Sequence, residues 1–257
     1  MSVKFFARFN LHNSICENPI SVSHLRPFLD MSDGELLSML DEIKDIQNKR
    51  AERIKNQMPT ECGALRGKRV VFLGDSITSD NLGYRETVTL AGELLATDGA
   101  VSGATSSMIL HSAKMHIEKS KPDIVSIMIG SNDSVCIGSG TLQQVSLSEY
   151  ERNVKSIVGW AVKNGAKVLL FEIPPVSEKR FKKSFDGKSK LQSNENISVF
   201  NEALAKIAGD YGIKLISNGW LTDNDSMYMP DGIHLSLEGQ EEFAKRWLKE
   251  ASLLQLL

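Results

Sequence analysis

The chain has 257 residues, enough for one large α/β domain or for a core domain with an appendage. Its hydrophobic fraction of 41% and charged fraction of 24% are ordinary for a soluble globular protein. The net charge of −2 provides no basic field that would gather phosphates, so nucleic acid is not an expected partner.

The sequence does not predict a membrane span, a secretory signal or a cysteine framework. The longest apolar runs, such as 127–129 and 168–171, are far too short to cross a bilayer. Cys16, Cys62 and Cys136 are widely and irregularly spaced, which predicts neither a disulfide framework nor a zinc site. We therefore expect a cytoplasmic protein with reduced thiols.

Residues 1–65 differ in pattern from the rest and are interpreted as an N-terminal helical extension. Ser32 and Glu35 have the spacing of a capping box, and apolar residues then recur at helical spacing to about residue 54. The opposite face of this helix is rich in charge. The helix should therefore pack one stripe against the core or against another subunit, in which case the protein would be a homo-oligomer.

From residue 68 onward, apolar runs rich in β-branched residues alternate with helix-period segments. The expected strands are 69–73, a weak one within 94–101, 123–129, 166–173 and 213–217. The expected helices are 106–119, 148–164, 195–211 and 236 to about 254, with Ser148 and Glu151 at capping-box spacing. Strict alternation predicts a doubly wound parallel sheet in a three-layer α/β/α domain over residues 66–257.

The first core strand ends at Gly74-Asp75-Ser76, where a doubly wound sheet collects its functional groups. Ser76 could have an exposed hydroxyl and a free backbone N–H that stabilises an oxyanion. The alternative is a simple polar cap where a strand meets a helix. Thr78 occupies the position of the second glycine of a G-x-S-x-G elbow, so a catalytic Ser76 would need its base from a different arrangement.

Histidine is the expected base, and the chain offers five candidates. His12 and His24 lie outside the core, and His111 and His116 point to different faces of one expected helix. His234 lies in "PDGIHLSLEGQ", three residues after Asp231, whose carboxylate could fix the imidazole tautomer. The alternative reading is a turn at Asp231-Gly232 with His234 capping the last helix.

Four segments together resemble the signature blocks of the SGNH hydrolases, the GDSL-type esterases and lipases. The segments are "GDSIT" (74–78), "VSGATS" (101–106), "GSND" (130–133) and "DGIHLSLEG" (231–239). They occur in the order and approximate spacing of that family, over residues 68 to about 255. The resemblance implies a flavodoxin-like sheet and a serine mechanism without metal or other cofactor.

Carried over by position, the family motifs imply Ser76 as nucleophile, His234 as general base and Asp231 as the residue that orients His234. They also imply an oxyanion hole formed by the Ser76 and Gly103 backbone N–H groups and the Asn132 side-chain amide. Asn132 could instead be an ordinary turn residue. Asp75 and Asp133 are expected to be structural.

The sequence departs from the family pattern at two positions near these blocks. Leu235 follows the histidine, where the family often has proline. Asp98 replaces a frequent asparagine, which makes hydrogen bonding near Gly103 less secure.

A basic stretch, residues 176–192, should lie over the same edge of the sheet. Its cationic residues are Lys179, Arg180, Lys182, Lys183, Lys188 and Lys190. It is either a solvated loop or a mobile flap that attracts an anionic substrate.

These observations favour a serine esterase that removes a short acyl group, acetyl in particular, from a carbohydrate or similar polar metabolite. Within the same family, a lysophospholipase or thioesterase is the alternative. An acyltransferase, or a carbohydrate-binding or scaffolding relative without turnover, remains open because fold alone does not establish activity.

Overall fold

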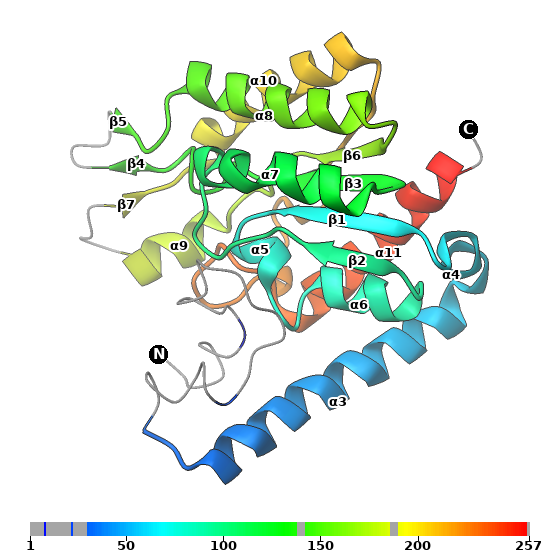
Figure 1. Ribbon diagram of the computed structural model, residues 1–257. Helices are drawn as coiled ribbons and strands as arrows, with labels where there is room; N and C mark the ends of the chain where they lie inside the picture. Colours follow the sequence, from blue (N-terminus) through cyan, green and yellow to red (C-terminus); the bar gives the residue numbers. More distant parts are fainter. Residues whose placement is uncertain (1–7, 9–21, 23–29, 138–141, 186–189, 256–257) are drawn as a thin grey trace.

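The computed structural model describes residues 8, 22, 30–137, 142–185 and 190–255. Its centre is a parallel five-stranded sheet with helices on both faces (Figure 1). The strands are β1 (Arg69–Gly74), β2 (Leu95–Asp98), β3 (Ile124–Met128), β6 (Lys167–Phe171) and β8 (Leu215–Ile216). Their spatial order is β2-β1-β3-β6-β8, which is the flavodoxin-like order. The predicted three-layer α/β/α fold is confirmed.

One face of the sheet is covered by helices α7 (Ser106–Ser120), α8 (Leu147–Lys163) and α10 (Asn194–Tyr211). The other face is covered by α6 (Tyr84–Ala91) and α11 (Leu237–Gln255). Successive strand residues alternate between these two cores: Val71 and Leu73 face the first, whereas Val70 and Phe72 face the second. Burial of the central strands on both faces explains their nearly continuous apolar sequences.

The N-terminal part is helical and packs against the second core. Helix α3 (Asp33–Gln57) begins with the predicted capping box, in which Ser32 and Glu35 bond reciprocally. Helix α4 (Pro59–Leu65) follows, and Ile54, Cys62 and Leu65 join the core around Phe72 and Trp247. Figure 1 shows α3 as a long helix along the outside of the α6 layer. The division into residues 1–65 and 66–257 stays a prediction.

Several local details differ from the sequence-based expectations. Helix α8 is capped by Ser146 and not by Ser148: its N-cap lies two residues earlier than expected, and the Glu149 N–H donates to the Ser146 hydroxyl. Strand β2 is not buried on both faces, since it lies at the sheet edge and its Leu95 is 61% exposed. Helix α6 was not predicted from the sequence.

Beside the main sheet lies a small antiparallel sheet in the order β5-β4-β7, which the sequence did not predict. Its strands are β4 (Cys136–Ile137), β5 (Leu142–Gln143) and β7 (Lys190–Leu191). The short helices α5 (Ser76–Ser79) and α9 (Glu178–Phe185) and two 3₁₀ turns, η1 (Gly219–Leu221) and η2 (Asp225–Met227), complete the described elements. None of the helices in the described ranges combines the length and hydropathy that crossing a membrane requires.

Candidate active site

Ser76 is the first residue of helix α5, directly after β1. Asp75 is the N-cap of this helix, and its carboxylate accepts the Ile77 N–H at 3.1 Å. The same carboxylate accepts hydrogen bonds from the N–H and hydroxyl groups of Ser131. Asp75 therefore holds the turn that presents Ser76, which agrees with the structural role expected for it.

The Ser76 hydroxyl lies beside the imidazole of His234. Ser76 Oγ is 2.8 Å from His234 Nε2, and His234 Nδ1 is 2.7 Å from Asp231 Oδ2. Ser76 and His234 are 158 positions apart in the sequence, yet their side chains are in hydrogen-bonding contact. All three side chains are mostly buried, so water competes weakly with these bonds.

Asp231 is held in place by the backbone that follows it. Its Oδ1 accepts the Ile233 N–H at 2.9 Å and the His234 N–H at 3.0 Å, while Oδ2 faces the imidazole. Burial alone would raise the pKa of Asp231, but the hydrogen bond and charge of His234 and the two N–H donors outweigh burial and lower it. The carboxylate is therefore ionised at neutral pH and orients the imidazole.

Helix α9 packs directly on the loop that carries Asp231 and His234. The Ser177 N–H donates to the Gly232 carbonyl at 2.8 Å, and the Ser184 hydroxyl donates to the Pro230 carbonyl at 2.8 Å. Gly232 has φ of +75°, and a Cβ atom there would lie 2.5 Å from the Phe181 nitrogen. Position 232 thus needs glycine for both its backbone conformation and its close contact with α9.

The loop of Gly103 and the residue Asn132 are joined by a side-chain hydrogen bond. The Asn132 amide donates one N–H to the Ala104 carbonyl at 2.9 Å, which fixes it to the loop containing Gly103. Gly103 has φ of +77°, and a Cβ atom there would meet nothing within 4 Å. Within the described part of the chain, neither the Ser76 N–H nor the Gly103 N–H has a hydrogen-bond acceptor.

Asp98, which stands where the family frequently has asparagine, contacts a nearby backbone N–H and a buried guanidinium. Its Oδ1 accepts the Ala100 N–H at 2.9 Å, and its Oδ2 lies 3.3 Å from the Arg85 guanidinium. Arg85 is buried and also donates to the Thr78 carbonyl in α5. The loop toward Gly103 and the helix of Ser76 are thereby connected. The sequence did not single out Arg85, because one charged residue in an unrecognised helix carries no motif.

Asp133 caps helix α7 from a distant part of the chain. Its two carboxylate oxygens lie 2.9 and 3.0 Å from the Ser106 nitrogen, while the N-cap Thr105 makes no side-chain cap. Burial, and to a smaller degree the nearby Asp75, raises the pKa of Asp133 to about 6, against the lowering effect of the Ser106 bonds. This contact fits the structural role expected for Asp133.

The basic stretch forms helix α9 and is not a loop along residues 178–185. Arg180 is half-buried and donates to the Tyr228 carbonyl at 3.2 Å, so it supports the His234 loop. Lys179, Lys182 and Lys183 are exposed. Lys188 lies outside the described residues, as do His12, His24 and Cys16.

Comparisons with known proteins agree with this fold and with the family that the sequence resembles. Residues 72–242 match the family model described as the GDSL-like lipase/acylhydrolase family. The chain is 27% identical over 191 residues to the isoamyl acetate-hydrolyzing esterase 1 homolog of Rattus norvegicus, with 67% of this chain and 77% of the rat protein covered. Identity to the Homo sapiens homolog is also 27%, covering 76% of this chain and 88% of the human protein.

Two solved structures illustrate the likeness in fold. TesA superposes with a TM-score of 0.56 and 23% identity, covering 74% of this chain and 100% of TesA. An acetyl-xylooligosaccharide esterase from Geobacillus superposes with a TM-score of 0.56 and 21% identity, covering 72% of this chain and 94% of that protein.

Proposed function

The chain belongs to the GDSL-like lipase/acylhydrolase family and is an ester-bond hydrolase, and on this premise we propose that Ser76, His234 and Asp231 form its catalytic triad. The observation that carries the proposal is the contact of 2.8 Å between Ser76 Oγ and His234 Nε2, with Asp231 bonded to the other ring nitrogen. A serine hydroxyl becomes a competent nucleophile when a neighbouring base takes its proton.

In the proposed reaction, Ser76 Oγ attacks the acyl carbonyl while His234 Nε2 accepts the hydroxyl proton. The tetrahedral intermediate collapses to an acyl-Ser76 ester, and the leaving alcohol takes that proton from His234. A water molecule, deprotonated by His234, then attacks the acyl-enzyme, and release of the acid restores the Ser76 hydroxyl. Asp231 stays ionised throughout and stabilises the imidazolium.

The oxyanion hole is proposed to consist of the Ser76 and Gly103 N–H groups and the Asn132 amide. What supports this is that both backbone donors are without acceptors among the described residues, and the amide bonded to Ala104 retains a second N–H. Preorganised donors of this kind contribute about 3 kcal/mol each to lowering the barrier when they face the developing negative charge.

For the substrate, we propose a short acyl ester, acetyl in the first instance, of a carbohydrate or another polar metabolite. The names of two relatives, an isoamyl acetate-hydrolyzing esterase homolog and an acetyl-xylooligosaccharide esterase, point to acetyl esters. Within the described helix α9, the cations that could attract an anionic substrate are the exposed Lys179, Lys182 and Lys183, whereas Arg180 is engaged with Tyr228.

Labelling with a fluorophosphonate probe tests the nucleophile, and a series of esters tests the acyl preference. Wild type should be labelled and should hydrolyse p-nitrophenyl acetate with a higher kcat/KM than the octanoate or palmitoyl-CoA. Ser76→Ala should abolish labelling and lower kcat by a factor of about 10⁴ or more. Ser79→Ala, three residues further along the same short helix, is the matched control and should leave labelling intact.

Each alternative gives a different result in these measurements. A higher kcat/KM for long-chain substrates would replace the acetyl esterase by a lysophospholipase or thioesterase. Transfer of acetyl to an added sugar acceptor would indicate an acyltransferase. A folded wild type that neither reacts with the probe nor turns over any ester would contradict the triad.

A further inference from the structure

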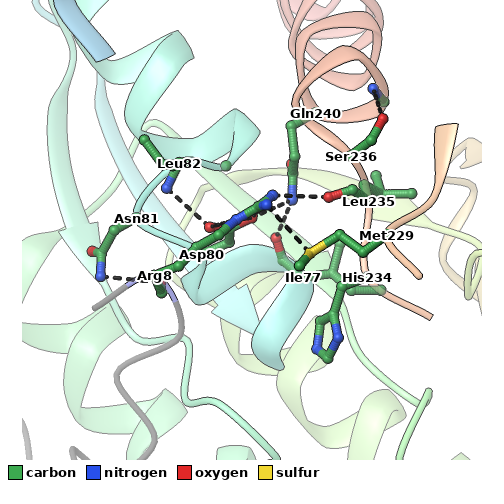
Figure 2. Close-up of polar contacts among 12 residues, drawn as sticks. Arg8, Ile77, Asp80, Asn81, Leu82, Met229, His234, Leu235, Ser236 and Gln240 are labelled. Atoms are coloured by element: carbon green, nitrogen blue, oxygen red, sulfur yellow. Dashed lines mark hydrogen bonds and ion pairs between the residues drawn. The ribbon is translucent and has the colours of Figure 1, made fainter. Parts of the chain in front are cut away.

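We propose that Arg8 is a positioning residue that fixes the helix of Ser76 against the loop of His234. This inference rests on the proposed function of those two residues. Arg8 belongs to the N-terminal segment before the four family motifs, and its side chain is 9% exposed. Figure 2 shows its guanidinium between Asp80 on one side and Leu235 and Met229 on the other.

The first contact of Arg8 is with the end of the helix that begins at Ser76. Asp80 is the C-cap of α5, and its side chain is completely buried. Arg8 Nε lies 2.7 Å from Asp80 Oδ1, and Arg8 Nη2 lies 2.6 Å from Asp80 Oδ2. This fork-shaped pairing fixes the direction of both groups as well as their distance.

The second contact of Arg8 is with the residue that follows His234. The same Nη2 donates to the Leu235 carbonyl at 2.8 Å, and Nη1 contacts Met229 Sδ at 3.2 Å. Met229 and Leu235 lie near the two ends of the His234 loop, residues 228–235. The Met229 N–H donates to the His234 carbonyl at 2.7 Å. One guanidinium therefore bonds to both chain segments whose side chains meet at Ser76 and His234.

The backbone of Arg8 is also fixed by hydrogen bonds, so both its main chain and its side chain are held in place. The Arg8 carbonyl accepts the Asn81 N–H at 2.9 Å and the Asn81 side-chain amide at 3.1 Å (Figure 2). A group fixed at both its backbone and its side chain loses little further freedom when it supports a neighbour. Arg8 is thus suited to positioning.

Gln240 of α11 also bonds to the α5 segment that begins at Ser76, but its side-chain amide does not bond to the His234 loop within the described structure. Its amide donates to Asp80 Oδ2 at 3.0 Å and to the Ile77 carbonyl at 3.3 Å, and it lies on α11. Without Arg8, the Asp80 carboxylate would keep Gln240 and the Leu82 N–H as donors, whereas the Leu235 carbonyl would lose its guanidinium partner. The His234 side of the site is therefore the part expected to move.

Measuring the fluorophosphonate labelling of Arg8→Met separates positioning from stability. The rate constant of labelling reports the Ser76–His234 geometry, and the final labelled fraction reports how much protein is folded. We expect the rate constant and kcat/KM for p-nitrophenyl acetate to fall at least about tenfold, because a shift near 1 Å at reacting groups has effects of this size or larger. The labelled fraction should stay near that of wild type.

Three further variants sharpen the test. Arg8→Lys keeps the charge but offers no planar fork, so its labelling rate should lie between those of wild type and Arg8→Met. Arg8→Met combined with Asp80→Asn removes the unpaired buried charge, so the melting temperature should recover while the labelling rate stays low. Arg53→Met removes an exposed ion pair between α3 and Glu241 of α11 and should label within twofold of wild type.

Labelling of Arg8→Met at the wild-type rate would overturn the inference. So would a fall in rate that the double variant restores together with stability, because Arg8 would then act only on folding. An unlabelled wild type would instead contradict the proposed nucleophile.

Discussion

Asp133 shows how a buried carboxyl near the candidate site makes stability depend on pH. It is fully buried, near the buried Asp75, and its principal donor is the Ser106 N–H at the start of α7. Burial favours the neutral acid, so the pKa of Asp133 is about 6 in the folded protein against an ordinary value of 3.8. The folded state therefore binds this proton more tightly than the unfolded state does.

The sign of the pH effect follows from that difference. Because the folded pKa lies above the unfolded one, the stability contributed by this proton is complete below about pH 4 and is lost as pH rises through about 6. Asp133→Asn cannot ionise, yet its carbonyl oxygen can still accept the Ser106 N–H. Relative to wild type, its free energy of unfolding should rise by about 2 kcal/mol between pH 4 and pH 7.

Urea unfolding of both proteins over this pH range measures the difference. Asp45→Asn, which removes an exposed carboxylate of α3, is the control for the same substitution away from the core. Parallel pH curves for wild type and Asp133→Asn would mean that the pKa of Asp133 is not raised in the folded protein.

At the scale of elements, α9 and the loop 228–235 act as one unit. Two side chains of α9 donate to loop carbonyls: Arg180 to that of Tyr228 and Ser184 to that of Pro230. The N–H of Ser177, the residue before α9, donates to the Gly232 carbonyl. These bonds leave little space at Gly232, where the loop backbone touches α9. Residues 178–185 of the basic stretch thereby support the loop that carries the proposed base, His234.

Gly232→Ala should separate α9 from this loop and reduce activity. The added Cβ would lie 2.5 Å from the Phe181 nitrogen and 2.6 Å from the Ser177 oxygen, which are backbone atoms that must shift. We expect kcat/KM to fall at least tenfold, with a loss of stability of roughly 2 kcal/mol or more.

Gly165→Ala is the matched control, because Gly165 has nearly the same φ, +77°, but an added Cβ there meets nothing within 4 Å. It should lose about 1 kcal/mol of stability and keep wild-type kcat/KM. Equal activity in the two variants would show that contact with α9 does not position His234.

For the whole molecule, the N-terminal helix is part of the folded core. Ile54 of α3 is completely buried among the residues of the second core, which also contains Cys62, Leu65 and Trp247. Arg50, also on α3, is buried and donates to the Leu82 carbonyl at 2.5 Å. Unfolding of α3 would therefore expose apolar residues of this second core and the face of α6 on which α3 packs.

Ile54→Ala should lower the free energy of unfolding by about 2–5 kcal/mol, because it removes buried methyl groups and leaves a cavity. Leu37→Ala on the same helix is the control, since Leu37 is 53% exposed and its loss should change stability by less than about 0.5 kcal/mol. Denaturant unfolding followed by circular dichroism measures the free energy of unfolding of each variant. A loss for Ile54→Ala no larger than for Leu37→Ala would mean that α3 folds independently of the core.

The sequence by itself determined the layer order, because apolar strands buried on both faces and amphipathic helices have distinct periodicities. It also indicated Ser76, His234 and Asp231 as candidates, since strand ends and the Asp231–His234 spacing are local features. The sequence could not predict the hydrogen bonds among these residues, because the contact between Ser76 and His234 joins residues 158 positions apart.

Only the tertiary structure decided what supports these residues. Asp80 and Arg85 look like ordinary polar residues in the sequence, and for Asp133 the sequence indicated a structural role without naming its partner. Burial among distant partners gives all three their roles. The strand predicted within 94–101 is present as β2, but its position at the sheet edge was not predicted, and neither was the helix α9. An edge position and a docking partner are set by neighbours distant in the chain. Periodicity reports which side of an element is buried, whereas the partner that buries it depends on how the whole chain folds.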